Sequence, residues 1–158
     1  MKPLKRRSLL PCLVAGLSGW SAVLLAADTH DGFAGDWYSP PDDEDDVGAI
    51  IRLHKSGATW SGHIVQVNPS SRSKYTNDTP CEVCPPPQKG HILRGLQITW
   101  NLKESSDGLD SGEILDPGNG KVYHCSMQLI EQGSKLQVRG YVGLSLLGQT
   151  QVWTRHKK

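Results

Sequence analysis

The chain lacks the long apolar runs of an integral membrane protein and the clustered basic residues of a nucleic-acid binder. Beyond residue 27, no run is long and apolar enough to cross a bilayer. Four of the 17 Lys and Arg residues precede residue 28, so 13 remain against 16 Asp and Glu, a net charge of −3 with histidine neutral. Proteins bind phosphate backbones through clustered positive charge, which this stretch does not show. We therefore expect a protein that binds no nucleic acid and is not integral to a membrane.

Sequence signatures of catalysis are also missing from residues 28–158. Neither the G-x-S-x-G of a serine hydrolase nor the H-E-x-x-H of a zinc protease occurs there. The histidines are scattered, and the nearest group of carboxylates, Asp107 to Asp116, lies around a turn. We expect no enzyme, no catalytic residue and no cofactor, with thiol redox activity as an alternative.

The N-terminus has the pattern of an export signal. Four basic side chains lie within the first seven residues, a short apolar stretch follows, and Ala26 and Ala27 supply small residues for cleavage. Proline and glycine interrupt the apolar stretch, which disfavours a membrane anchor. The sequence predicts a cleaved signal peptide at 1–27 and a single domain at 28–158 that is periplasmic or secreted. Disulfides persist in such compartments.

Short alternating runs, rather than helical periodicity, characterise the remaining chain. In LQITWNL, for example, Leu96, Ile98, Trp100 and Leu102 would share one face of a strand. Eight such runs are separated by Gly, Pro, Asn and Asp, at about 33–39, 47–55, 58–68, 93–103, 109–115, 121–130, 134–143 and 148–155. Closing such a meander removes its edge strands, and eight strands enclose room for side chains or one small ligand. The sequence predicts an all-β fold, a small antiparallel up-and-down barrel of about eight strands.

A long connection at about residues 69–92 contains the sequence TPCEVCPPPQKG. Cys81 and Cys84 have C-x-x-C spacing, which occurs in redox centres, zinc sites and small disulfide loops. A redox site would need a helix N-terminus, but three prolines follow Cys84. A metal site would need further ligands, and Cys81, Cys84 and His91 form that alternative. We favour a Cys81–Cys84 disulfide with Cys125 as a free buried thiol, although spacing alone leaves pairing with Cys125 open.

Three segments resemble the bacterial domain-of-unknown-function family 2147: GDW at 35–37, ILDPGNGKVYHC at 114–125 and LQVRGYVGLSLLGQTQVWTR at 136–155. The resemblance covers about 33–155 and implies an exported protein with a lipocalin-like fold. Many members contain a C-x-x-C, which Cys81 and Cys84 match. The lipocalin-like relation also implies a G-x-W in the first strand, matched by Gly35 and Trp37, with Arg155 packing over the tryptophan. The resemblance implies neither a reaction nor a ligand.

Aromatic and polar side chains on the expected strands suggest a ligand site inside the barrel. Trp60, Trp100 and Trp153 could line a cavity, or be core residues, and Arg139 and Tyr141 could supply polar contacts at its mouth. The leading hypothesis is a non-enzymatic exported protein that binds a small apolar or amphiphilic ligand in the barrel. The alternatives are an envelope protein-interaction module with a filled barrel, and metal binding through the C-x-x-C loop.

Overall fold

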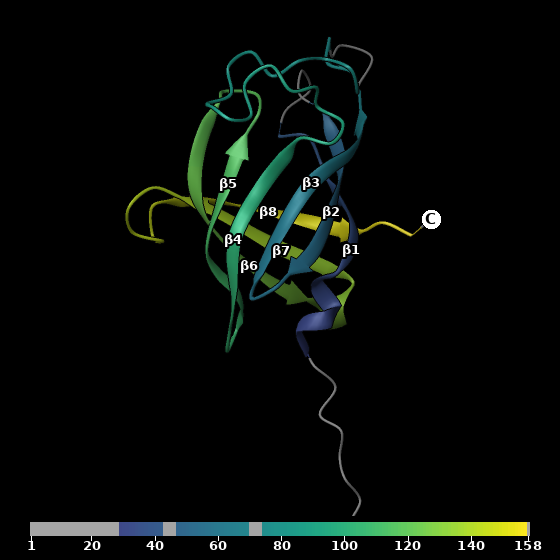
Figure 1. The fold of residues 1–158 in the computed structure, drawn as a ribbon. Helices are drawn as coiled ribbons and strands as arrows, with labels where there is room; N and C mark the ends of the chain where they lie inside the picture. Colours follow the sequence, from purple (N-terminus) through teal and green to yellow (C-terminus); the bar gives the residue numbers. More distant parts are fainter. Residues whose placement is uncertain (1–28, 43–46, 70–73, 158) are drawn as a thin grey trace, which may run out of the picture.

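Eight antiparallel strands follow one another in chain order and close into a barrel (Figure 1). The structure is a computed structural model that describes residues 29–42, 47–69 and 74–157, so the expected signal peptide lies outside the described residues. The 3-10 turns η1 (Thr29–Phe33) and η2 (Glu131–Gly133) precede the first and seventh strands. The strands are β1 (Gly35–Ser39), β2 (Gly48–Ser56), β3 (Thr59–Asn68), β4 (Gln97–Ser105), β5 (Gly108–Asp116), β6 (Lys121–Ile130), β7 (Lys135–Tyr141) and β8 (Gly148–Arg155).

The predicted up-and-down barrel of eight strands is confirmed, and one strand boundary differs clearly from its prediction. We expected the fourth strand to begin at about residue 93, but β4 begins at Gln97. The residues before it form a turn, in which the amide of Leu96 donates to the carbonyl of Leu93 at 3.1 Å and Gly95 has a φ of 90°. Glycine adopts a positive φ at little cost, so a turn forms where the apolar pattern indicated a strand.

Large side chains fill the half of the barrel next to η1, which we call the closed end. Two glycines on the inner face make room for them. A Cβ at Gly62 would lie 2.6 Å from Leu53 Cδ2, and one at Gly112 would lie 2.4 Å from Leu102 Cγ. Interiors are packed too densely to absorb such overlaps, so a side chain at either glycine would displace its neighbour. The core at this end consists of side chains at most 2% exposed, namely Phe33, Trp37, Trp60, Leu102, Leu109, Met127 and Leu136.

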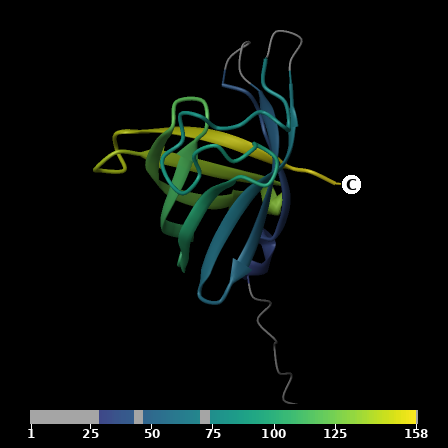
Figure 2. The same ribbon diagram turned by 45° about the horizontal axis from the view of Figure 1, so that its top comes forward.

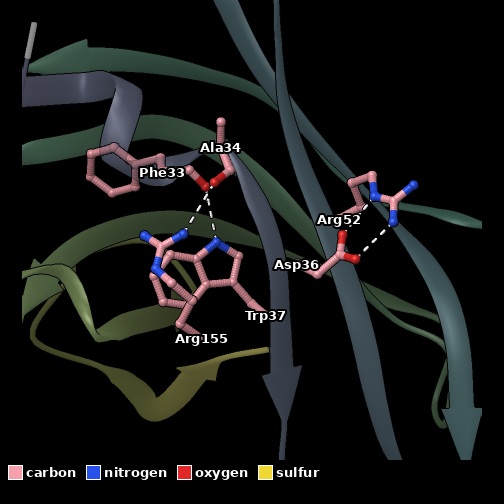
Figure 3. A network of polar contacts seen from close by, with 6 residues as sticks. All are labelled: Phe33, Ala34, Asp36, Trp37, Arg52 and Arg155. Atoms are coloured by element: carbon pink, nitrogen blue, oxygen red, sulfur yellow. Dashed lines mark hydrogen bonds and ion pairs between the residues drawn. The ribbon is translucent and has the colours of Figure 1, made fainter. Parts of the chain in front are cut away.

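The first and last strands meet over a very short pairing, which a stacked arginine reinforces. β1 and β8 pair through Trp37↔Arg155 and Tyr38↔Thr154. The guanidinium carbon of Arg155 lies 4.1 Å from the centroid of the Trp37 ring, as the lipocalin-like resemblance implies (Figure 3). The Trp37 indole also forms a hydrogen bond, in which its Nε1 donates to the carbonyl of Phe33 at 2.9 Å. Stacking and hydrogen bonding together fix the ring at the closed end.

Arg155 also ties three chain segments together through their carbonyl groups. Its Nε donates to Gly133 at 3.0 Å, its Nη1 donates to Ala34 at 3.2 Å, and its Nη2 donates to Gly32. Partial burial lowers the pKa of the guanidinium, but arginine remains charged in proteins. One side chain therefore connects η1, η2 and β8, a contact that we call the Arg155 clamp.

Two β-bulges in β4 override the predicted alternation of its side chains. The register with β3 shifts twice, and Asn101 has a left-handed backbone with a φ of 59°. Thr99 consequently faces the interior and is 0% exposed. Trp100 lies on the outer wall, where its Nε1 donates to Glu113 at 2.6 Å. The prediction that Trp100 shares a face with Leu102 is wrong, because a bulge adds a residue to one strand and breaks the two-residue period.

Replacing Arg155 with Ala should lower the free energy of unfolding by about 3 kcal/mol, because hydrogen bonds from charged donors contribute roughly 1.5–3 kcal/mol and the stack is lost as well. Urea denaturation checks this value. Arg94→Ala is the matched control, since the exposed Arg94 forms a surface ion pair with Asp78 and should change stability by less than about 1 kcal/mol. Equal losses in the two variants would contradict the Arg155 clamp.

Thr99→Val should stabilise the protein. Thr99 Oγ1 is buried and has no hydrogen-bond partner among the described residues. An unsatisfied buried hydroxyl costs about 1–3 kcal/mol, and valine preserves the side chain's shape, so we expect a gain of roughly 1 kcal/mol in urea denaturation. The exposed Thr154→Val change should have almost no effect. A destabilised Thr99→Val protein would show that the hydroxyl is in use.

Candidate functional site

The half of the barrel opposite the closed end is hollow. A cavity of about 710 Å³ lies between the last residues of the odd-numbered strands and the first residues of the even-numbered ones. Small-molecule sites typically measure roughly 300–1,000 Å³. The barrel is therefore not filled solid, which removes the premise of the filled-barrel alternative.

The cavity has an aliphatic wall and a polar mouth. Its wall carries side chains from five strands, namely Ala49, Ile51, Ile64, Val67, Ile98, Ile114 and Val138. Charged and amide residues line the part formed by the connections and the adjoining strand ends, namely Asp42, Lys74, Glu82, Asp116, Asn119 and Gln149. Such a gradient can hold an apolar group inside while a polar group stays hydrated at the opening.

Small residues on the inner face keep the cavity open. Gly140 is paired with Cys125 and Gln149 across the neighbouring strands and lines the cavity. A Cβ at Gly140 would meet Ile114 Cγ2 and Tyr123 Cβ at 3.7 Å each, which is ordinary contact. Gly140 thus differs from the glycines at the closed end, where a side chain would clash. A larger residue here would project into the empty space.

Gln151 organises one side of the cavity mouth. Its Nε2 donates to the carbonyl of Pro40 and to Asp42 Oδ1, each at 2.9 Å. Its Oε1 accepts hydrogen bonds from Ser39 Oγ at 2.8 Å and from the indole of Trp153. All of its amide groups face protein partners, so Gln151 joins the end of β1 to the start of β8 beside the cavity.

Residues 74–96, in the connection between β3 and β4, form a structure at the mouth that we call the cap. Its cysteines, Cys81 and Cys84, form a disulfide, which confirms the favoured pairing. The Cys81 amide donates to the carbonyl of His91 at 2.9 Å, and the Gly90 amide donates back to the Cys81 carbonyl at 2.9 Å. A further bond at 2.9 Å runs from the Leu93 amide to the Thr79 carbonyl. The backbone bonds and the disulfide give residues 79–93 a defined structure.

The cap rests on the turn between β5 and β6. Cys81 Sγ lies 3.6 Å from the carbonyl oxygen of Pro117. A Cβ at Gly120 would lie 2.0 Å from the Val83 carbonyl oxygen, so the backbones approach each other as closely as glycine alone permits. Cys81 and Val83 also line the cavity. The cap is therefore part of the site, and Figure 2 shows it gathered at the end away from η1.

Two of the five residues predicted to contact a ligand lie at the cavity. Trp153 lines it from the inner face of β8 and is 2% exposed. Tyr141 borders it, although its ring packs against His124, with 5.5 Å between the ring centroids. His124 is the cross-strand partner of Tyr141, so both rings belong to the outer face of the sheet.

The other three candidates lie elsewhere. Trp60 is in the closed-end core, with its Nε1 donating to Glu104 at 3.0 Å. Trp100 is on the outer wall, as described above. Arg139 alternates with the inward-facing Val138, and its guanidinium binds the Ser145 carbonyl instead of the cavity.

Sequence reasoning missed Tyr123 and Gln151, both of which line the cavity. Strand alternation could have found them, because Tyr123 shares a face with Cys125 and Gln151 shares one with Trp153. The aliphatic wall residues carry no such distinguishing signal. Valine and isoleucine facing a cavity are indistinguishable in sequence from the same residues in a solid core.

The disulfide takes the two sulfurs that the metal alternative requires. Cys81 and Cys84 are bonded to each other, and His91 is exposed. Within the described ranges, no three His, Cys, Asp or Glu residues are grouped so as to hold a metal ion. The third described cysteine, Cys125, is a free thiol that is 0% exposed on the inner face of β6.

Comparisons with known proteins agree with this geometry. Residues 35–155 match the family model described as "Uncharacterized protein conserved in bacteria (DUF2147)". Among solved structures, the chain is similar to protein HP1028 from the human pathogen Helicobacter pylori, which belongs to the lipocalin family. The TM-score is 0.65 at 13% identity, covering 79% of this chain and 83% of that chain, and at this identity the likeness shows the fold alone.

A search of curated proteins finds no match. Within the part of the chain that the structure describes, helices with the length and apolar character needed to cross a membrane are absent.

Native Cys125 should resist alkylation at pH 8 and react once urea unfolds the chain. Burial raises the pKa of its thiol from 9.0 to about 12, and the thiolate is the reactive form. Between pH 9 and 12 the thiol stays protonated in the folded state but ionises in the unfolded one, so its contribution favours unfolding as the pH rises through that window. Peptide mapping after iodoacetamide treatment without reductant checks this. Rapid labelling of the native protein would contradict the buried position.

Proposed function

The chain belongs to the DUF2147 family, as its motifs predicted, and we propose that it binds a small apolar or amphiphilic molecule in its barrel. The observation that carries this proposal is the cavity of about 710 Å³, with an aliphatic wall and a polar mouth. An apolar ligand gains about 25 cal/mol for each Å² of apolar surface removed from water. A ligand with one polar end would leave that end among the charged and amide groups of the mouth.

Two features of the cavity lining favour binding without a chemical reaction. The five histidines with described side chains, His54, His63, His91, His124 and His156, are all outside its lining. The carboxylate of Asp116 is engaged by its own turn, since Oδ1 accepts from the Gly118 amide at 2.8 Å and Oδ2 accepts from Asn119 at 2.6 Å. General acid-base catalysis needs a group free to reach the substrate with a suitable pKa. We propose a carrier or sensor rather than an enzyme.

We propose that the protein lies outside the cytoplasm, in the periplasm or the secreted fraction. Its support is the predicted signal peptide together with the Cys81–Cys84 disulfide, a bond that persists in oxidising compartments. An apolar molecule is poorly soluble in these aqueous compartments, and an apolar cavity would shield it from water.

The test is binding of an apolar naphthylamine dye to the protein and to Gly140→Leu. The leucine side chain would occupy cavity space between Ile114 and Tyr123, so we expect the dye affinity to fall by about tenfold or more while the fold is retained. Fluorescence titration measures the affinity, and native mass spectrometry of gently isolated protein identifies any organic molecule that co-purifies.

Gln128→Leu is the matched control, because Gln128 is exposed on the outer face of β6. This variant places a leucine on β6, next to the strand that carries Gly140, but outside the cavity. It should therefore leave the dye affinity unchanged. Equal affinities for all three proteins, or no dye binding by the unaltered protein, would contradict ligand binding in the barrel.

A further inference from the structure

The connection between β7 and β8 exposes an unusual amount of aliphatic surface. It runs from Val142 to Leu147 and is here called the β7–β8 tip. Its large side chains are 65% exposed at Val142, 72% at Leu144, 85% at Leu146 and 73% at Leu147. Figures 1 and 2 show this connection projecting beyond the barrel wall in both views. Leaving four aliphatic side chains in water is unfavourable, and a contiguous exposed group of this kind marks an interaction site.

The charge pattern around the tip suits insertion into an apolar phase. No charged residue occurs between Arg139 and Arg155, and no Asp or Glu occurs anywhere from Gln132 to Lys158. The tip itself therefore carries no ionised side chain, and the nearest charge is the Arg139 guanidinium, which binds the Ser145 carbonyl. The segment that carries it is also free of the negative charge that anionic lipids would repel.

The backbone of the tip is already partly hydrogen-bonded within the protein. The Leu147 amide donates to the Leu144 carbonyl at 3.0 Å, and the Val142 amide donates to the Leu147 carbonyl at 3.4 Å. Arg139 adds two donors to the Ser145 carbonyl, one of them Nε at 2.7 Å. Unsatisfied backbone groups are costly in lipid, so these internal bonds reduce the free energy of insertion.

We propose that the β7–β8 tip inserts into the surface of a lipid bilayer and holds the barrel against it. The chemistry of the tip favours lipid over a protein partner. Protein interfaces are enriched in aromatic residues and arginine, whereas leucine and valine are under-represented among the residues that dominate binding. The tip offers four aliphatic side chains, one serine and one glycine, on a narrow projection rather than a broad face.

The position of the tip connects it to the cavity. Val142 and Leu147, the first and last residues of the tip, also line the cavity. A bilayer in contact with the tip would therefore lie beside the mouth, so an amphiphile could pass between the two with less exposure to water. This exchange rests on the proposed function, whereas the membrane contact itself does not.

Co-sedimentation with vesicles of phosphatidylethanolamine and phosphatidylglycerol tests the proposal. The unaltered protein should pellet with the vesicles, and Leu144→Ser/Leu146→Ser should reduce the partition coefficient by about tenfold or more. Added salt should have a small effect, because apolar insertion is not screened. Both leucines are highly exposed, so the variant should keep the melting temperature of the parent.

Val122→Ser/Val152→Ser is the matched control, since it replaces two exposed aliphatic residues of the outer wall. It should pellet like the parent. Three results would overturn the proposal: no pelleting of the parent, equal pelleting of the parent and the leucine variant, or pelleting abolished by salt. Leucine-dependent self-association without vesicle binding, measured by ultracentrifugation, would instead assign the tip to a contact between copies of the chain.

The same variants separate this inference from ligand binding. Gly140→Leu should lose dye affinity and keep vesicle binding, and the leucine variant should show the opposite. An unaltered protein that binds vesicles but no dye would contradict the cavity proposal and leave the membrane contact standing. An unaltered protein that binds dye but no vesicles would contradict the membrane contact and leave the cavity proposal standing.

Discussion

The barrel depends on the junction at which its first and last strands meet, and that junction is short. β1 and β8 share two residue pairs, too few to close a sheet securely by backbone hydrogen bonds alone. The Arg155 clamp compensates by stacking on Trp37 and binding carbonyl groups of η1 and η2. An unclosed sheet would expose two edges, and a barrel without edges has no site for unwanted strand pairing. The core and the cavity of this protein therefore depend on closure of the barrel.

Residue size then divides the closed barrel into a solid half and a hollow half. At the closed end, glycine on one strand faces a large side chain on another, as in the pair Gly112 and Leu102, and the space is filled. Near the mouth, a Cβ at Gly140 would meet its neighbours Ile114 and Tyr123 only at the ordinary contact distance of 3.7 Å. The same residue type thus has opposite effects in the two halves. The difference depends on the size and proximity of the side chains around each glycine, because a barrel of eight strands has room for little more than its own side chains.

The two structures at the mouth have different physical character. The cap is held by the Cys81–Cys84 disulfide, its own backbone bonds and close contact with the turn at Gly120. The β7–β8 tip projects away, with its leucines in water. In our proposals the cap limits the opening and the tip brings the opening to a lipid surface.

Local sequence determined the elements of this protein, and tertiary structure determined its site. Alternation of apolar residues and turn-forming Gly, Pro and Asn were enough to predict eight strands in order, because both act over a few neighbouring residues. The motifs that contain Trp37 and Arg155 also predicted the family, and with it the contact between these two residues where the barrel closes. The face of Trp100 could not be predicted, since the bulges in β4 depend on its pairing with β3. The size and position of the cavity could not be predicted either, because residues from distant strands come together to form it. Within any one segment, an aliphatic side chain that faces a cavity looks the same as one that packs in a solid core.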